Sequence, residues 1–143
     1  MDTSPEYIEM CRKATEIQDL WNPSVADCCM MKDDVFKITQ VGSDFLYPLS
    51  LYRLKDGNRM SWYSKADCTW LPRQDQLQHM VHEHHNLTAF HMLRSFTRWA
   101  ENKYGNAYGY GIIWDSFEKY WLEYAMYLIY RKVWNGSDWV EVD

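Results

Sequence analysis

The chain has no run or tail of basic residues. Its 15 Lys and Arg stand against 20 Asp and Glu, giving a net charge of −5, and the acidic excess is spread evenly. Binding of nucleic acid through many phosphate contacts needs a clustered basic surface, so broad nucleic-acid binding is not expected. An acidic protein of this kind could still imitate nucleic acid or bind a basic partner surface.

Long hydrophobic runs are missing as well. The longest, Tyr124–Tyr130, falls far short of the ~20 apolar residues that span a bilayer. The opening residues, Met1 to Pro5, are polar and do not resemble a secretory leader. We therefore expect a protein of the reduced cytoplasm that has no membrane partner.

Catalytic motifs are the third absence. The pair His82-Glu83 would need a histidine at position 86 for the H-E-x-x-H motif, but that residue is Asn86. The segment Gly105–Gly111 lacks the Gly-Lys-Ser/Thr of a phosphate-binding loop, and no carboxylate pair stands out. A nucleophile such as Cys68 or Cys28 paired with a histidine has no local motif to support it. We expect a protein that is not an enzyme and has no cofactor.

What the chain does contain is a distinctive junction, Cys68–Gln78. Thr69–Leu71 is β-prone, and Pro72 ends that strand because it has no N–H to donate. From Gln74 to His85 there is no Gly or Pro, and apolar residues recur at helical spacing. The junction therefore predicts a strand, a proline stop and a helix. We expect Trp70 to point into the core and Leu71 to lie outward or at a rim.

The rest of the chain predicts an α+β fold in a single domain, residues 1–143. Ser4 and Pro5 begin a helix that ends before Asn22-Pro23. Between Cys28 and Trp70 we expect about four short antiparallel strands in one small sheet, with a hairpin at Asp56-Gly57.

Two or three helices then follow the sheet. One begins at Asn86 or Thr88 and runs to Tyr104. Its predicted inner stripe consists of Phe90, Leu93, Thr97, Ala100 and Tyr104. The last helix runs from Asp115 or Ser116 to Val133 or Trp134, and a short strand over 139–142 ends the fold. Because that helix is apolar around most of its circumference, we expect it in the core, with a subunit interface, and hence a homo-oligomer, as the alternative.

Two groups of side chains are candidate sites. One is a polar recognition surface at the start of the junction helix, and it consists of Arg73, Gln74, Asp75, Gln76 and Gln78. The same residue types also suit an ordinary helix start. The other group is Asp75, His79 and His82, which share one helix face and could bind a divalent metal with a further ligand. A solvated polar face is the alternative interpretation of these histidines.

The string Trp70–Gln78 resembles a signature of small uncharacterised proteins encoded by bacterial phages and prophages. Weaker similarity to the same family covers Glu6–Ala14, Trp21–Pro23 and parts of the stretch from Asp115 to Val140. The chain departs from the family at Ser24–Asp27, where relatives tend to carry a Gly-Asp pair, and in its histidine-rich stretch His79–His91. The resemblance implies a phage or prophage origin and a location in the host cytoplasm, and it implies no activity.

The sequence thus favours a non-enzymatic accessory protein that binds a host or phage macromolecule, in particular a protein. Interference with host defence or metabolism would be a natural use of such a protein and rests on the resemblance alone. Two alternatives stay open. One is a metal-binding module or metal-dependent enzyme built on Asp75, His79 and His82. The other is a small-ligand binder with an aromatic pocket, since the chain holds 8 Trp, 11 Tyr and 5 Phe.

The cysteines give a first testable prediction. Cys11, Cys28, Cys29 and Cys68 form no C-x-x-C pair, and Cys28 and Cys29 are adjacent, so they point to opposite faces of a strand. We expect all of them to be free thiols. Thiol counting under denaturing, non-reducing conditions checks this, and a count below that of the four cysteines contradicts it.

Overall fold

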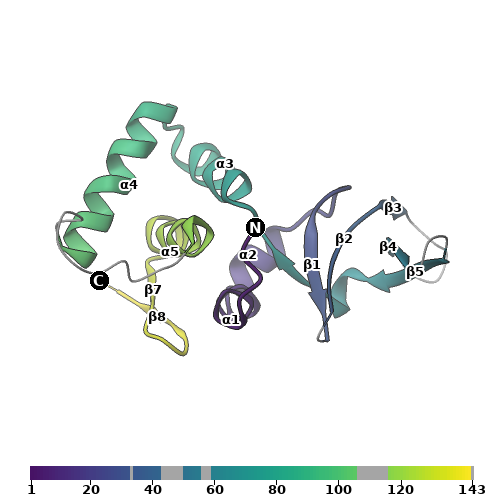
Figure 1. Ribbon diagram of the computed structural model, residues 1–143. Helices are drawn as coiled ribbons and strands as arrows, with labels where there is room; N and C mark the ends of the chain where they lie inside the picture. Colours follow the sequence, from purple (N-terminus) through teal and green to yellow (C-terminus); the bar gives the residue numbers. More distant parts are fainter. Residues whose placement is uncertain (33, 43–49, 56–58, 106–115, 143) are drawn as a thin grey trace. The chain divides into compact units, whose positions relative to one another are not determined.

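The α+β class is confirmed by the computed structural model, which describes residues 1–32, 34–42, 50–55, 59–105 and 116–142. Of residues 50–55 and 59–62 only the backbone is described. Figure 1 traces helices, then strands, then the helices of the second half. The chain divides into two compact units, Thr3–Pro72 and Met1–Asp2 with Arg73–Asp143, so the boundary falls inside the junction string. The single domain stays a prediction.

The first unit begins with two short helices, α1 (Pro5–Lys13) and α2 (Thr15–Leu20), in place of one continuous helix. Ser4 caps α1 as predicted, and its hydroxyl accepts a hydrogen bond of 3.3 Å from the Tyr7 N–H. The break lies at Ala14, where ψ is 64°, outside the helical range. α2 ends at Leu20, before Asn22-Pro23, as expected from the restriction that a proline places on the preceding residue.

The strands of this unit form two antiparallel sheets. One has the order β2-β1-β6, from β1 (Cys28–Met31), β2 (Asp34–Lys37) and β6 (Thr69–Leu71). The other has the order β3-β4-β5, from β3 (Gln40–Gly42), β4 (Ser50–Lys55) and β5 (Arg59–Ser64). The hairpin is confirmed by the pairing of Lys55 with Arg59, whereas its Asp56-Gly57 turn lies outside the described residues. The prediction of a single sheet of about four strands therefore gave too few strands and too few sheets.

A glutamine ties α2 to the edge strand β6. The Gln18 side chain accepts a 2.8 Å hydrogen bond from the Trp70 N–H and donates a 3.0 Å bond to the Trp70 carbonyl. It donates another 3.0 Å bond to the Cys11 carbonyl. One amide group thus satisfies backbone groups of a strand edge and a helix end, which would otherwise need water.

Trp70 points inward as predicted, but the expected outward position of Leu71 is wrong. Trp70 is 6% exposed and its ring stacks on Trp21 at 5.9 Å, while Leu71 is fully buried. β6 has no solvent face because α1 packs beside it and Trp21 covers Trp70. The Trp70 indole N–H is buried and finds no hydrogen-bond partner among the described residues, so the expected bond to a carbonyl is not made.

The second unit consists of α3 (Gln74–His85), α4 (Ala89–Tyr104), α5 (Phe117–Tyr130), β7 (Lys132–Trp134) and β8 (Trp139–Glu141). Thr88 and Ser116 cap α4 and α5 as predicted. α5 does not run on to Val133 or Trp134, because Arg131 takes a left-handed conformation (φ 56°) and the next residues pair with β8 in a hairpin. No helix in the described part of the chain is both long and apolar enough to span a membrane.

The core of this unit is built around α5, whose residues Trp121 to Met126 are all buried. Phe96 of α4 stacks on Trp121 with ring centroids 4.3 Å apart, and Trp99 lies 5.2 Å from Tyr124. α3 contributes Leu77 and Val81, both fully buried. This burial agrees with the core position expected for the last helix.

The predicted inner stripe of α4 is largely wrong. Phe90 is 71% exposed and Leu93 is 58% exposed, whereas Phe96 and Trp99 are buried. The helix carries two apolar stripes, and the one with the larger aromatic surface packs against Trp121 and Tyr124. The other stripe is left facing solvent.

The stacked pair Trp21–Trp70 gives a stability prediction. Trp70→Ala removes a large buried ring and leaves a cavity beside Trp21, so it should lower the free energy of unfolding by about 3–5 kcal/mol. Leu20→Ala, at a residue 62% exposed, is the control and should change stability by less than about 0.5 kcal/mol. Urea unfolding followed by circular dichroism measures both, and equal midpoints for the two variants would show that Trp70 is not part of the core.

Candidate functional site

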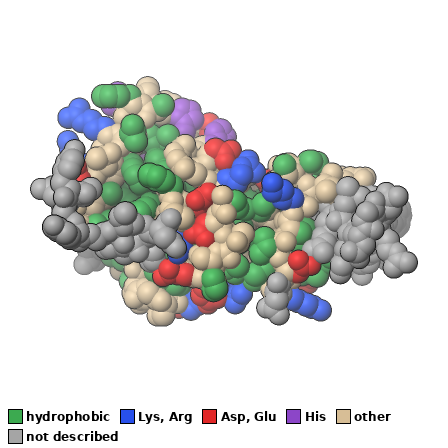
Figure 2. Space-filling view, viewed as in Figure 1, with side chains coloured by type: hydrophobic (Ala, Val, Ile, Leu, Met, Phe, Trp, Pro, Cys, Tyr) green, Lys and Arg blue, Asp and Glu red, His purple; other side chains and the backbone are tan. Residues whose placement is uncertain are grey.

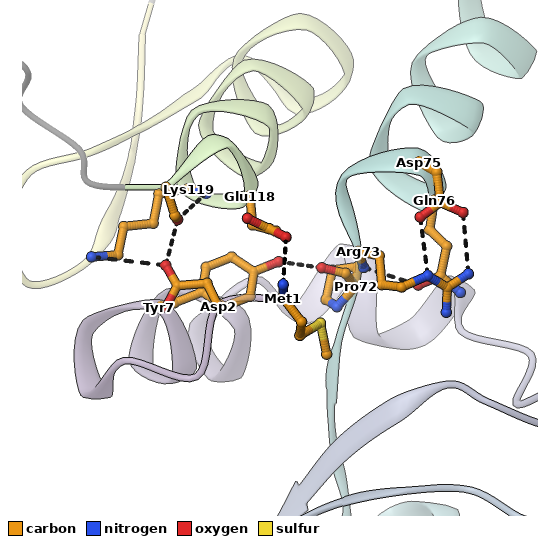
Figure 3. Close-up of polar contacts among 10 residues, drawn as sticks. Met1, Asp2, Tyr7, Pro72, Arg73, Asp75, Gln76, Glu118 and Lys119 are labelled. Atoms are coloured by element: carbon orange, nitrogen blue, oxygen red, sulfur yellow. Dashed lines mark hydrogen bonds and ion pairs between the residues drawn. The ribbon is translucent and has the colours of Figure 1, made fainter.

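Three of the predicted recognition residues at the start of α3, Arg73, Asp75 and Gln76, contact one another (Figure 3). The Arg73 guanidinium lies 3.0 and 3.1 Å from the Asp75 carboxylate oxygens, and this contact lowers the pKa of Asp75 below its ordinary value. The Arg73 N–H donates a 2.9 Å hydrogen bond to the Gln76 side chain. These bonds fix the first turn of α3. A recognition role for Arg73, Gln74, Asp75, Gln76 and Gln78 stays a prediction.

The predicted metal ligands do not converge on one point in the described part of the chain. The rings of His79 and His82 lie 6.4 Å apart, and Asp75 is paired with Arg73. His82 Nδ1 lies 2.5 Å from the Leu87 carbonyl oxygen. Among the described residues, no three His, Cys, Asp or Glu side chains are placed to hold one metal ion. Metal binding at these residues also stays a prediction.

All of the cysteines belong to the first unit, and each is a free thiol. A hydrogen bond between Cys29 and Cys68 lowers the pKa of the Cys68 thiol and raises that of Cys29. Cys68 lines a hollow of about 460 Å³ beside Lys65, but the Lys65 ammonium donates a hydrogen bond to the Trp21 carbonyl. Thr3–Pro72 contains no histidine, so no Cys–His pair forms within that unit.

One surface feature of the second unit is the outward stripe of α4, which sequence periodicity assigns to the core. We call it the outer face of α4, and it consists of Phe90, Leu93, Arg94, Thr97, Arg98 and Glu101, which together line a shallow hollow. Figure 2 shows hydrophobic and basic side chains gathered at the upper left, where Figure 1 places α4. Among the described residues, no carboxylate forms an ion pair with Arg94 or Arg98.

A groove of about 520 Å³ lies on the other side of Arg98, between α4, α5 and the β7–β8 hairpin. α4 contributes Ser95, Arg98, Trp99, Asn102 and Lys103 to its lining. α5 contributes Tyr124, Tyr127 and Leu128, and the hairpin region contributes Arg131, Val133 and Val142. We call this the aromatic groove. Sequence reasoning missed it because its residues come from segments far apart in the chain.

The floor of the aromatic groove holds a buried phenol. Tyr124 is 1% exposed, and burial raises the pKa of its hydroxyl above the ordinary value of 10.0, against a smaller opposite effect of the nearby Ser95. The hydroxyl nevertheless makes no hydrogen bond of normal geometry among the described residues. Buried polar groups without a partner are rare in native proteins, so the floor of this groove has an unused hydrogen-bonding group.

A buried ion pair holds α4 against α5 next to this groove. The Glu123 carboxylate is 1% exposed and accepts hydrogen bonds from the Lys103 ammonium and the Tyr104 hydroxyl. Lys103 Nζ also lies 5.5 Å from the Trp99 ring centroid. The positive charge of Lys103 is therefore already matched by Glu123. Among the described residues that line the groove, Arg98 and Arg131 carry charges without an ion-pair partner.

Comparison of the chain with known protein families, with curated proteins and with solved structures finds no match. What the protein does must therefore be inferred from its own side chains and their surroundings.

The Glu123 ion pair gives a second stability prediction. Lys103→Met leaves a buried carboxylate with one partner fewer and should cost about 3 kcal/mol of unfolding free energy. The double variant with Lys103→Met and Glu123→Met removes both charges and should be more stable than Lys103→Met alone. Urea unfolding of the three proteins measures this. A double variant that is less stable than Lys103→Met would show that the Glu123 carboxylate stabilises the fold even without Lys103.

Proposed function

We propose that this protein is a non-enzymatic accessory protein that binds an acidic surface of a protein partner through the outer face of α4. The observation that carries the proposal is the exposure of Phe90 (71%) and Leu93 (58%) beside the guanidiniums of Arg94 and Arg98, which form no ion pair with any described residue. Phe90 and Leu93 are one helical turn apart, so they form a continuous apolar patch and are not isolated surface residues.

The residue types of this face are those of protein interfaces. Aromatic residues and arginine are enriched where proteins meet, and they supply most of the binding energy measured there. An amphipathic helix presents such anchors at i and i+3, which fits Phe90 and Leu93. Keeping both side chains in water is unfavourable, and covering them with a partner removes that cost.

The charge of the helix determines which sign of charge the partner surface should carry. The outer face of α4 carries two basic side chains, Arg94 and Arg98, against one acidic side chain, Glu101, in a protein whose net charge is −5. An acidic patch on the partner would attract this helix and speed association. The sign is opposite to the basic partner that the net charge alone suggests, because the local charge of α4 differs from the charge of the whole chain.

The origin and location are part of the same proposal. The resemblance of Trp70–Gln78 to phage and prophage proteins supports synthesis in an infected or lysogenic bacterium and action in the host cytoplasm. Interference with host defence would be a natural use of such a protein. The small-ligand alternative is favoured by a different observation, the aromatic groove, and is taken up below.

The test is capture of a partner from infected or lysogenic host cells, with variants that leave the fold intact. We expect wild-type protein to retain a partner at constant stoichiometry. Phe90→Asp with Leu93→Asp, and separately Arg94→Glu, should weaken capture roughly tenfold or more. The matched control is Leu20→Asp, an exposed leucine of the first unit, which should capture the partner as wild type does.

Two further experiments test the other possible binding surface and the other possible occupant. Arg73→Ala and Gln74→Ala test the start of α3, and loss of capture by these variants alone would place the interface there. Light scattering after size exclusion tests a second copy of the chain as the occupant. Self-association that Phe90→Asp with Leu93→Asp abolishes would replace the partner with a homo-oligomer. Equal capture by every variant would refute a role for either surface.

A further inference from the structure

We propose that the aromatic groove is a binding site for a small planar aromatic anion, distinct from the outer face of α4. Its volume, about 520 Å³, falls within the range typical of small-molecule sites, roughly 300–1,000 Å³. The site combines an aromatic floor with charged residues at its edge, and each part selects one property of the ligand.

The charges select an anion. Arg98 and Arg131 are both exposed, and neither forms an ion pair with a carboxylate in the described part of the chain. Lys103 adds no net charge because Glu123 pairs with it. The carboxyl end of α5 places about half a negative charge near Arg131, which is less than the two full guanidinium charges. The groove is therefore positive within an acidic protein.

The floor selects an aromatic ring. The ring centroids of Trp99 and Tyr127 lie 6.3 Å apart with an angle of 32° between their planes, and the Tyr124 ring centroid lies 5.2 Å from that of Trp99. Leu128, Val133 and Val142 complete an apolar wall. A flat ring can pack on such a surface at little conformational cost, whereas a hydrated inorganic anion would gain nothing from it.

The arginine guanidiniums can both contact an aromatic ring and bind an anionic group. The Arg131 guanidinium carbon lies 6.0 Å from the Tyr127 ring centroid, within the range of a cation–π contact. Arginine also binds carboxylate or phosphate oxygens through two parallel hydrogen bonds. A ligand ring over Trp99 with its anionic group toward Arg98 and Arg131 would use every part of the site. The Tyr124 hydroxyl, for which the described residues supply no hydrogen bond of normal geometry, also belongs to a residue that lines the groove.

The experiment uses isothermal titration of the full chain with two probes of equal shape, 2-naphthoate and its neutral analogue 2-naphthamide. We expect naphthoate to bind roughly tenfold or more tightly than naphthamide, the factor that one charge-assisted contact supplies. This comparison needs no variant, so it does not depend on how any substitution folds. Equal affinity for the two probes, or no binding of naphthoate, overturns the proposal.

Variants then locate the site. Arg98→Gln and Arg131→Gln should each weaken naphthoate binding roughly tenfold and leave naphthamide binding almost unchanged. Arg94→Gln is the matched control, because it removes a guanidinium from the same helix outside the groove, and it should bind both probes as wild type does.

Two results would contradict this site. One is weakening by Arg94→Gln that equals the weakening by Arg98→Gln. The other is loss of naphthoate binding in the Phe90→Asp and Leu93→Asp double variant while Arg131→Gln still binds, which would move the ligand to the outer face. Partner capture by Arg131→Gln, measured with purified proteins and no groove ligand, separates the two proposals: Arg131 does not line the outer face, so capture should match wild type.

Discussion

The fold of the second unit depends on the burial of α5. Six consecutive residues, Trp121 to Met126, are buried, so apolar surface must be covered on every side of the helix. α3, α4 and the β7–β8 hairpin share that task. The more aromatic stripe of α4 packs against α5, with Phe96 on Trp121, and the second stripe stays exposed to solvent. The proposed binding face thus follows from how the core is completed.

The first unit is built from short helices and strands, and each of them buries little surface against its neighbours. Strands of three to six residues and helices of six and nine residues cannot be stable alone. Polar side chains do part of the joining. Gln18 connects α2 to β6, and the buried Asp27 accepts hydrogen bonds from the Trp21 indole and the Ser24 N–H. Each of these groups is buried or half-buried with its hydrogen bonds made, so it adds specificity at little cost.

Local signals predicted local structure well. Pro72 and the residues after it located α3 from Gln74 to His85, and Ser4, Thr88 and Ser116 marked helix starts. Periodicity failed on α4 because both of its stripes are apolar, and only the partner ring on α5 decides between them. The end of α5 was missed because Arg131, which is not a glycine, takes a positive φ. The aromatic groove brings together residues from Ser95 to Val142, which no local pattern relates.

Arg98 belongs to both the outer face of α4 and the aromatic groove. A single guanidinium cannot orient its donors fully toward two anions on opposite sides, so a ligand in the groove would draw it away from a partner on the helix. The two binding equilibria would then be thermodynamically linked, and each occupant would weaken the other by the same factor. A small aromatic anion could in this way set how firmly the protein holds its macromolecular target.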